Sequence, residues 1–249
     1  MKSKTLKRIE FSTAALLLAL ALGCGKAGEP AAVAAPAPVT TEVAKPAAAA
    51  APAETAAPTT PAGMVRYDAQ PGGSKCTIAG SSTIHDWTMD SAIIIGFIEA
   101  DAKFPESALA DAAAAKPTVQ VAMPVKAFKS GNAKMDQRMK VEMSETNYPK
   151  FEYRLIELKP KSKAGDTGAL QFDAVGALTI TGTTVTNTMP VAIEKKDGKL
   201  KVTGSTPIKF TEYNLKPPVI NLLGIPTLSV GDDLKITYEW SLAPKAAVK

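Results

Sequence analysis

The sequence has few of the side chains on which catalysis and metal binding most often depend. It contains two cysteines, Cys24 and Cys76, and one histidine, His85. One histidine and a distant thiol offer too few ligands for a typical zinc site. Asp86 follows His85 directly, and adjacent strand positions face opposite ways, so the two do not form a relay. We therefore predict no enzymatic activity, no metal and no resident cofactor, with His85 as a hydrogen-bonded, half-buried strand residue. Haem ligation by His85 and a methionine is the open alternative.

Long apolar runs and basic clusters are also scarce. After residue 22, no run approaches the roughly 18 apolar residues that a membrane-spanning helix needs. The formal net charge is +5, but four of the basic residues stand within the first eight positions. No dense Lys/Arg cluster interleaved with aromatic residues follows them. We therefore predict no nucleic-acid partner.

The N-terminal segment is typical of an exported protein. Basic residues precede an apolar run from Phe11 to Leu22, which is followed by Gly23 and Cys24. A cysteine directly after a small residue resembles a bacterial lipoprotein signal. The resemblance implies that Cys24 is acylated and anchors the chain to a membrane, so that no internal disulfide can form. Gly25, rather than aspartate, then implies the outer membrane, on the periplasmic side of the cell envelope. The alternative is an ordinary secretory signal that contains a cysteine.

Residues 25–63 consist almost entirely of Ala, Pro, Thr, Val and Glu. Such a composition has too little bulky apolar surface to offset the entropy of ordering the chain. We expect a disordered tether whose prolines favour extended stretches and oppose a helix. The sequence thus divides into a signal peptide over residues 1–23, a tether over 24–63 and a globular domain over 64–249.

The globular part alternates apolar and polar residues with a period of two. The alternation is clear in residues 119–125, 170–180, 201–210 and 234–242, and it is typical of strands with one buried face. Asp197-Gly198 is a strong hairpin signal. Successive hairpins indicate an antiparallel sheet, and closing the sheet removes its exposed edges. We predict a closed antiparallel barrel. Its inward glycines, Gly176 and Gly204, either leave room for a lumen or permit strand bends.

One segment departs from this alternation. Ala133 to Glu145 carries Met135, Met139 and Met143 at steps of four, between charged residues. This spacing predicts a short amphipathic helix. The methionine stripe has two interpretations: it covers a barrel mouth, or its flexible thioethers line the entrance of a pocket for an apolar ligand.

Three motifs occur in a recognisable order. They are Gly80 to Trp87, Asn147-Tyr148-Pro149-Lys150-Phe151, and Val175 to Thr184. Together they resemble the YceI-like family of periplasmic lipid-binding proteins over residues 65–243. The resemblance implies an eight-stranded, antiparallel, lipocalin-like barrel that binds long polyisoprenoid chains, such as quinone tails, in an apolar tunnel. It also suggests a homodimer. The usual Arg-x-Asp-Phe-Gly motif near the C-terminus is replaced here by residues 210–218, so the identity of the lipid stays open.

We therefore predict non-enzymatic binding, storage or transport of an apolar, isoprenoid-type lipid in the bacterial cell envelope. The alternative is a structural lipoprotein with a filled core that docks a partner through the apolar loop at 217–226. In the first hypothesis the inward stripes and the helix line the cavity. The predicted lining residues are Trp87, Val121, Met123, Met135, Met139, Phe151, Tyr153, Phe172, Leu178, Val191, Phe210, Tyr238 and Trp240.

Overall fold

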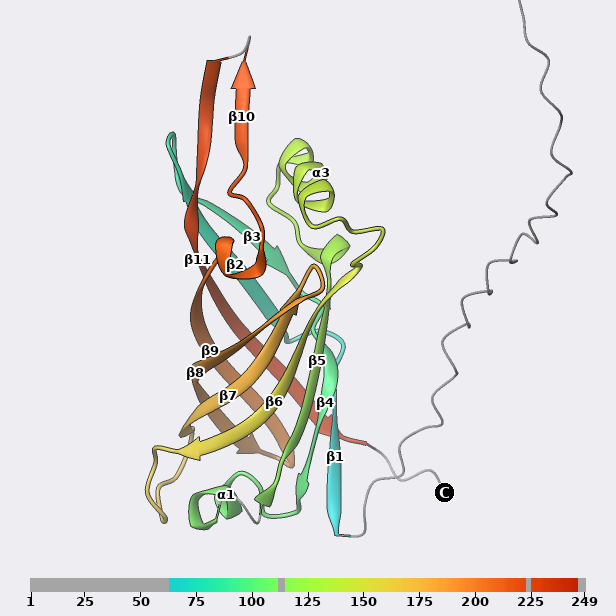
Figure 1. The fold of residues 1–249 in the computed structure, drawn as a ribbon. Coiled ribbons are helices and arrows are strands. Elements are labelled where there is room, and N and C mark those ends of the chain that lie inside the picture. Colours follow the sequence, from blue (N-terminus) through green and yellow to red (C-terminus); the bar gives the residue numbers. More distant parts are fainter. Residues whose placement is uncertain (1–62, 112–114, 223–224, 246–249) are drawn as a thin grey trace, which may run out of the picture. The chain divides into compact units, whose positions relative to one another are not determined.

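The computed structural model describes residues 63–111, 115–222 and 225–245 (Figure 1). Cys24, the predicted signal peptide and all but the last residue of the predicted tether lie outside these residues. The strands are β1 (Met64–Ala69), β2 (Lys75–Ser82), β3 (Trp87–Ser91), β4 (Ile95–Asp101), β5 (Thr118–Pro124), β6 (Lys150–Pro160), β7 (Leu170–Ile180), β8 (Thr183–Lys196), β9 (Lys199–Lys209), β10 (Val219–Leu222) and β11 (Ile225–Pro244). The helices are α1 (Glu106–Ala110) and α3 (Ala133–Glu142), with short 3-10 turns η1 (Val125–Ala127) and η2 (Thr211–Tyr213).

The sheet closes on itself as an antiparallel barrel. Its ring runs β1-β4-β5-β6-β7-β8-β9-β11 and returns to β1, where Tyr67 pairs with Pro244 and Ala69 with Leu242. This ring of eight strands confirms the predicted fold. Tight two-residue turns connect β7 to β8 and β8 to β9, and the second is the hairpin that Asp197-Gly198 predicts. Thr181 and Gly182 have φ values of 46° and 79°, and Asp197 and Gly198 have 51° and 74°, as two-residue hairpins of this twist require.

The strands β1 and β2 lie one after the other along the same edge of β11. Residues 70–74 leave the sheet between them and are held at Ser241. The Gln70 amide donates to the Ser241 carbonyl at 2.9 Å, and the Ser241 hydroxyl donates to the Gly73 carbonyl at 2.8 Å. The Ser241 amide donates to the Ser74 hydroxyl at 3.1 Å. The β2–β3 hairpin therefore extends the wall beyond the point where β1 and β11 close it.

The core lies inside the barrel because most inward residues of the long strands are apolar. Along β7, burial alternates from Leu170 to Ile180. The two ends are covered differently (Figure 1). Beside α1, Phe104 and Ala108 are buried and seal one end. At the other end lies α3, in which no residue is fully buried.

Two segments differ from the sequence-based expectation. The predicted helix over Ala133–Glu145 ends at Glu142, with Met143 as its C-cap. The segment 217–226 is not a loop: β10 pairs with the beginning of β11. The two strands form a hairpin at the α3 end of the barrel (Figure 1). The apolar run in this segment is so short that its pattern does not distinguish a strand from an apolar loop.

Candidate functional site

The interior of the barrel contains two apolar cavities. The first has a volume of about 100 Å³ and lies toward α1, where Phe104 forms part of its floor. The second has a volume of about 70 Å³ and lies toward α3, beneath Met139 and Met143. We call them the α1-end cavity and the α3-end cavity. Met123, Leu178 and Ile236 line both, so these three side chains separate them.

Most predicted lining residues face one of these cavities. Val121, Tyr153, Val191, Tyr238 and Trp240 line the α1-end cavity. Trp87, Met139, Phe151 and Phe210 line the α3-end cavity. Met123 and Leu178 face both.

Two predicted residues face neither cavity. Phe172 is fully buried, with 0% exposure, among its neighbours in the core. Met135 is partly buried and packs against the core. Sequence reasoning also missed several lining residues. Met189 could have been predicted from the alternation of strand faces, because it has the same parity as Val191. Phe104 and Tyr213 could not have been predicted in this way, because they lie in irregular segments rather than in strands.

The room opposite the inward glycines is occupied by aromatic rings. The Tyr153 ring lies over Gly176 and the Tyr238 ring lies over Gly204, each so close that a β-carbon at the glycine would collide with the phenol. These glycines therefore admit rings rather than leaving an open lumen. The result is an interior with small cavities in place of a continuous wide tunnel.

Few polar atoms reach the α1-end cavity. The Tyr238 hydroxyl donates to the Met189 sulfur at 3.6 Å, and the Thr206 hydroxyl donates to the Pro207 carbonyl at 3.3 Å. The Tyr153 hydroxyl and the Trp240 indole nitrogen are buried without a hydrogen-bond partner. Burial raises the pKa of Tyr153, and it raises that of Tyr238 together with the nearby Tyr153 and Cys76. Both phenols therefore stay protonated and neutral at physiological pH.

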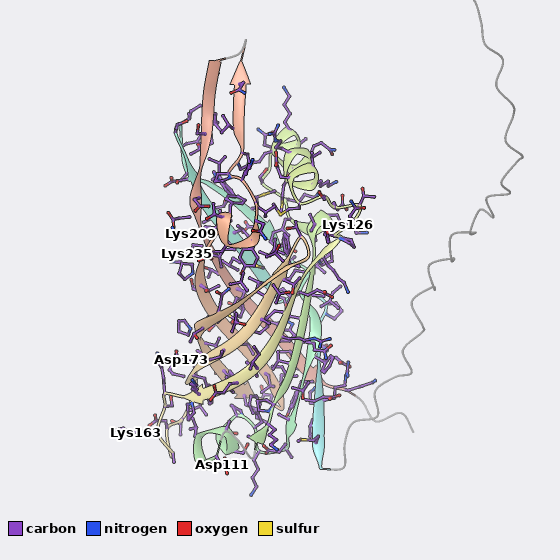
Figure 2. All side chains as sticks on the ribbon, viewed as in Figure 1. Asp111, Lys126, Lys163, Asp173, Lys209 and Lys235 are labelled. Atoms are coloured by element: carbon purple, nitrogen blue, oxygen red, sulfur yellow. The ribbon has the colours of Figure 1, made fainter. Side chains whose placement is uncertain are left out.

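Charged side chains lie on the outside of the barrel. Lys235, labelled in Figure 2, is exposed on β11, between the inward residues Leu234 and Ile236. Within the described ranges, no group of three or more His, Cys, Asp or Glu side chains is arranged to hold a metal ion. In the same part of the chain, no helix is long and apolar enough to cross a membrane.

His85 differs from its predicted setting. It is exposed in the turn between β2 and β3 rather than half-buried in a strand. The Ser82 hydroxyl accepts the His85 amide at 3.2 Å and donates to the His85 carbonyl at 2.7 Å. This local turn takes the chain out of the sheet, and the alternation of faces does not continue through it.

Cys76 is a buried, unreactive thiol. It is 1% exposed, at the wall of the α3-end cavity. Burial, and secondarily the charge of Asp90, raises its pKa from 9.0 to about 12. It packs as a small apolar side chain, in agreement with its strand parity with Ile78.

Comparison with known proteins supports this fold. Residues 67–242 match the family model of the YceI-like domain. No curated protein sequence matches the chain. The structure of Burkholderia cenocepacia BcnA superposes with a TM-score of 0.54 at 19% identity, covering 70% of this chain and 99% of that one. A polyisoprenoid binding domain from Saccharophagus degradans, implicated in plant cell wall breakdown, has a TM-score of 0.53 at 12% identity and covers 72% and 98%.

Proposed function

Because the chain belongs to the YceI-like domain family, we propose that its barrel binds the hydrocarbon chain of an isoprenoid-type lipid without chemical conversion. The observation that carries this proposal is the pair of apolar cavities stacked inside one closed wall. Each methylene buried in such a site contributes about 0.8 kcal/mol. Several isoprene units therefore supply enough free energy to offset the ordering of a flexible chain.

The size of the cavities requires the interior to widen on binding. A dry cavity of about 150 Å³ accommodates benzene, whereas the α1-end cavity measures about 100 Å³. Met123, Met139, Met143 and Met189 line the two cavities. Methionine has flexible torsions and fills irregular space. We propose that these side chains rearrange, that Met123 moves aside, and that the two cavities then join.

The α3 end is the proposed entrance. At the α1 end, Phe104 is 1% exposed and closes the interior. At the opposite end, α3 has no fully buried residue, and only Met139 and the C-cap Met143 reach the cavity beneath it. Displacing α3 therefore exposes little apolar surface, whereas opening the α1 end breaks a packed core.

A cavity-filling substitution tests this proposal. Ala174 is buried and lines the α1-end cavity, so Ala174→Leu should occupy it. Ala177 lies on the same strand and faces the outer surface, so Ala177→Leu is the matched control. Saturable uptake of a radiolabelled long-chain isoprenoid by the full-length protein should fall at least tenfold in Ala174→Leu and persist in Ala177→Leu. Absence of saturable uptake in the wild type, together with lipid-free protein by mass spectrometry after extraction, overturns the proposal.

We further propose that the protein acts while anchored by acylated Cys24 on the periplasmic side of the outer membrane. The support is the lipoprotein-like signal before Cys24. Metabolic labelling with an alkyne fatty acid should mark the wild type and the Cys76→Ser control but not Cys24→Ser. Equal labelling of all three proteins contradicts the anchor. Separation of the two bacterial membranes then tests the outer-membrane assignment.

Docking of a partner at the α3 end is the second candidate function. Ile84, Val141 and Val219 are exposed, at 62%, 63% and 44%. The β2–β3 turn, α3 and the β10–β11 hairpin that carry them lie at this same end (Figure 1). Limited proteolysis separates the two candidates. If the β10–β11 hairpin is already protected from cleavage in the isolated protein, docking is contradicted. Docking is also contradicted if adding envelope extract does not increase the protection of the hairpin.

A further inference from the structure

We propose that the barrel wall opens sideways between β3 and residues 129–145, which we call the α3 segment, and that the lipid passes through this seam. The segment swings outward about its two ends while β3 stays in the sheet. The backbone bridge between Asp90 and Lys129 is the latch that keeps the seam closed. This inference rests on the proposed lipid-binding function and deepens it, because it assigns the moving part and the contact that holds it.

One isolated bridge joins β3 to the α3 segment. The Asp90 amide donates to the Lys129 carbonyl, and the Lys129 amide donates to the Asp90 carbonyl, both at 2.8 Å. On its other edge, β3 pairs with β2 over its whole length. Among the described residues, no other backbone hydrogen bond crosses the seam. Local opening is easiest where few hydrogen bonds hold an element, so the seam is the weakest joint of the wall.

The side chains at the bridge each stay on their own side of the seam. The Asp90 carboxylate accepts the Thr77 hydroxyl and lies 3.4 Å from the Lys75 Nζ, and both of these residues belong to β2. The Lys129 Nζ lies 3.9 Å from the Asp136 carboxylate, within the α3 segment. Within the described ranges, opening the seam therefore breaks two backbone hydrogen bonds and no ion pair.

The α3 segment is held together by its own polar contacts. The Asp136 carboxylate accepts both the amide and the hydroxyl of Ser130 at 2.7 Å. Asn132 caps the start of α3, and the Arg138 Nε lies 2.6 Å from the Glu142 carboxylate one turn further along. Because none of these contacts involves the barrel, the segment can leave the wall as one folded body.

The chain is anchored where the segment begins. Phe128 is 1% exposed, and its ring centroid lies 5.7 Å from that of Phe151 on β6. The Val125 amide donates to the Pro149 carbonyl at 2.9 Å, which joins the two ends of the excursion between β5 and β6. Hinges are commonly a few residues at the end of an element. The hinge therefore follows Phe128, where η1 ends.

The α3-end cavity lies directly behind the seam. Met89 on β3 lines it from one side, and Met139 and Met143 in the α3 segment line it from the other. Met89 and Met143 are 3% and 7% exposed, so they close the interior while the seam is shut. Flexible thioethers adapt to an irregular apolar chain. A long hydrocarbon therefore reaches the cavity through the side of the wall, and the packed α1 end stays intact.

A disulfide across the bridge tests the latch. Asp90→Cys together with Lys129→Cys places two thiols on the paired residues. Antiparallel residues that exchange both hydrogen bonds have Cα atoms about 5.5 Å apart, a separation that a disulfide spans. The full-length chain also carries Cys24→Ser and Cys76→Ala, so that the engineered thiols are the only ones present.

The matched control is a disulfide inside the neighbouring ladder. Ala79→Cys together with Thr88→Cys, in the same background, joins β2 to β3 at residues that are already paired. This second disulfide makes the same strand more rigid but leaves the seam free. Each protein is compared with itself before and after reduction by dithiothreitol, which removes the effect of the substitutions themselves.

The probe is tritiated geranylgeraniol carried in phosphatidylcholine vesicles. In the oxidised Asp90→Cys/Lys129→Cys protein, uptake and release should each slow by roughly tenfold or more, because a required conformational change limits both rates. Reduction should restore them. The Kd should change by less than about threefold, since the lock raises the barrier in both directions. The control protein should keep its rates in both redox states.

Hydrogen exchange gives a second measurement that needs no lipid. In the wild type, the amides of Asp90 and Lys129 should exchange together and roughly tenfold or more faster than the amides between β7 and β8. The oxidised lock should slow the exchange of the α3 segment. If both bridge amides exchange only through global unfolding, the seam does not open and the inference is wrong.

The outcomes separate this inference from the proposed function. Unchanged rates after oxidation, with saturable uptake, overturn the seam and leave lipid binding intact. Equal slowing in the control protein also overturns it, because general stiffening of β3 then explains the result. A weaker affinity with an unchanged release rate contradicts the latch. Absence of saturable uptake in the wild type and in every reduced protein overturns the proposed function itself.

Discussion

The phenol ring of Tyr153 on β6 lies against the backbone of Gly176 on β7, with no room for a β-carbon between them. A similar pair joins Tyr238 on β11 to Gly204 on β9. Each ring covers a glycine of the strand beside it and also lines the α1-end cavity. The cavity that remains is therefore shaped by two glycines as much as by the side chains that line it.

Gly176→Ala should force the Tyr153 ring out of this position. The added methyl group overpacks a tight contact, and such changes typically cost about 1–3 kcal/mol in the free energy of unfolding. Urea denaturation measures the loss. In a Tyr153→Ala background the same Gly176→Ala substitution should cost far less, because the collision is gone. Equal costs in the two backgrounds contradict the contact.

Phe172→Ala should be among the most destabilising core substitutions. The side chain is completely enclosed, and truncating a buried phenylalanine typically costs about 3–5 kcal/mol. The neighbouring Gln171 is exposed, so Gln171→Ala should stay within about 0.5 kcal/mol of the wild type. Chemical denaturation of both variants provides the comparison. Because Phe172 faces neither cavity, lipid affinity measured well below the unfolding transition should be retained in Phe172→Ala.

Alkaline pH should destabilise the fold through Cys76. Burial raises the pKa of the folded thiol from 9.0 to about 12, so the folded state keeps a proton that the unfolded state releases. The stabilisation is complete below pH 9 and is lost as pH rises toward 12, with a limiting slope of about 1.4 kcal/mol per pH unit.

Cys76→Ala isolates this contribution. Between pH 9 and 10 the free energy of unfolding should fall less steeply in the variant than in the wild type, because the titration of unfolded tyrosines contributes equally to both proteins. In the native wild type, a thiol-specific reagent at pH 8 should react with Cys76 only as fast as the protein opens. Parallel slopes in the two proteins, or rapid labelling, mean that the thiol is more accessible than the structure shows.

Asn132→Ala should loosen α3 selectively. The Asn132 side chain caps the helix by accepting the amides of Lys134 and Met135 at 3.0 and 3.3 Å. Loss of such a cap costs about 1 kcal/mol. Hydrogen exchange of α3 amides should accelerate severalfold while the barrel strands stay protected. Asn132→Asp preserves an equivalent cap and should behave like the wild type. If α3 covers the entrance, lipid exchange should also accelerate only in Asn132→Ala.

The barrel was predictable because its pattern is local and repeated. Alternation sets the inward face of each strand, and Asp197-Gly198 sets a hairpin register that the structure reproduces. These signals placed Tyr153 and Tyr238 on the interior correctly. They did not show that each ring lies over a glycine, because that depends on the register between strands. Between β6 and β7 the register shifts at Leu155 and Glu157, so counting residues from a turn gives the wrong partner.

The remaining differences arise where one residue overrides the local pattern. The hydrogen bonds of Ser82 turn the chain before His85 and remove that histidine from the sheet. Phe172 has the inward parity of a lining residue, yet its neighbours leave no space beside it. Alternation shows which face of a strand is apolar. Whether a cavity forms there depends on how completely the inward side chains fill the space inside the barrel. The unpartnered hydroxyl of Tyr153 and indole N–H of Trp240 are likewise visible only in three dimensions.

The pairing of β11 with β1 also sets the order in which the molecule can become functional. The strand that seals the wall is the last one in the sequence, and it joins Pro244 to Tyr67 near the beginning of the domain. Contacts so distant along the chain form slowly during folding. No enclosed interior exists until the whole domain has been synthesised. A lipid is therefore either loaded into the finished barrel or trapped as the last strand docks, and refolding with and without lipid distinguishes the two routes.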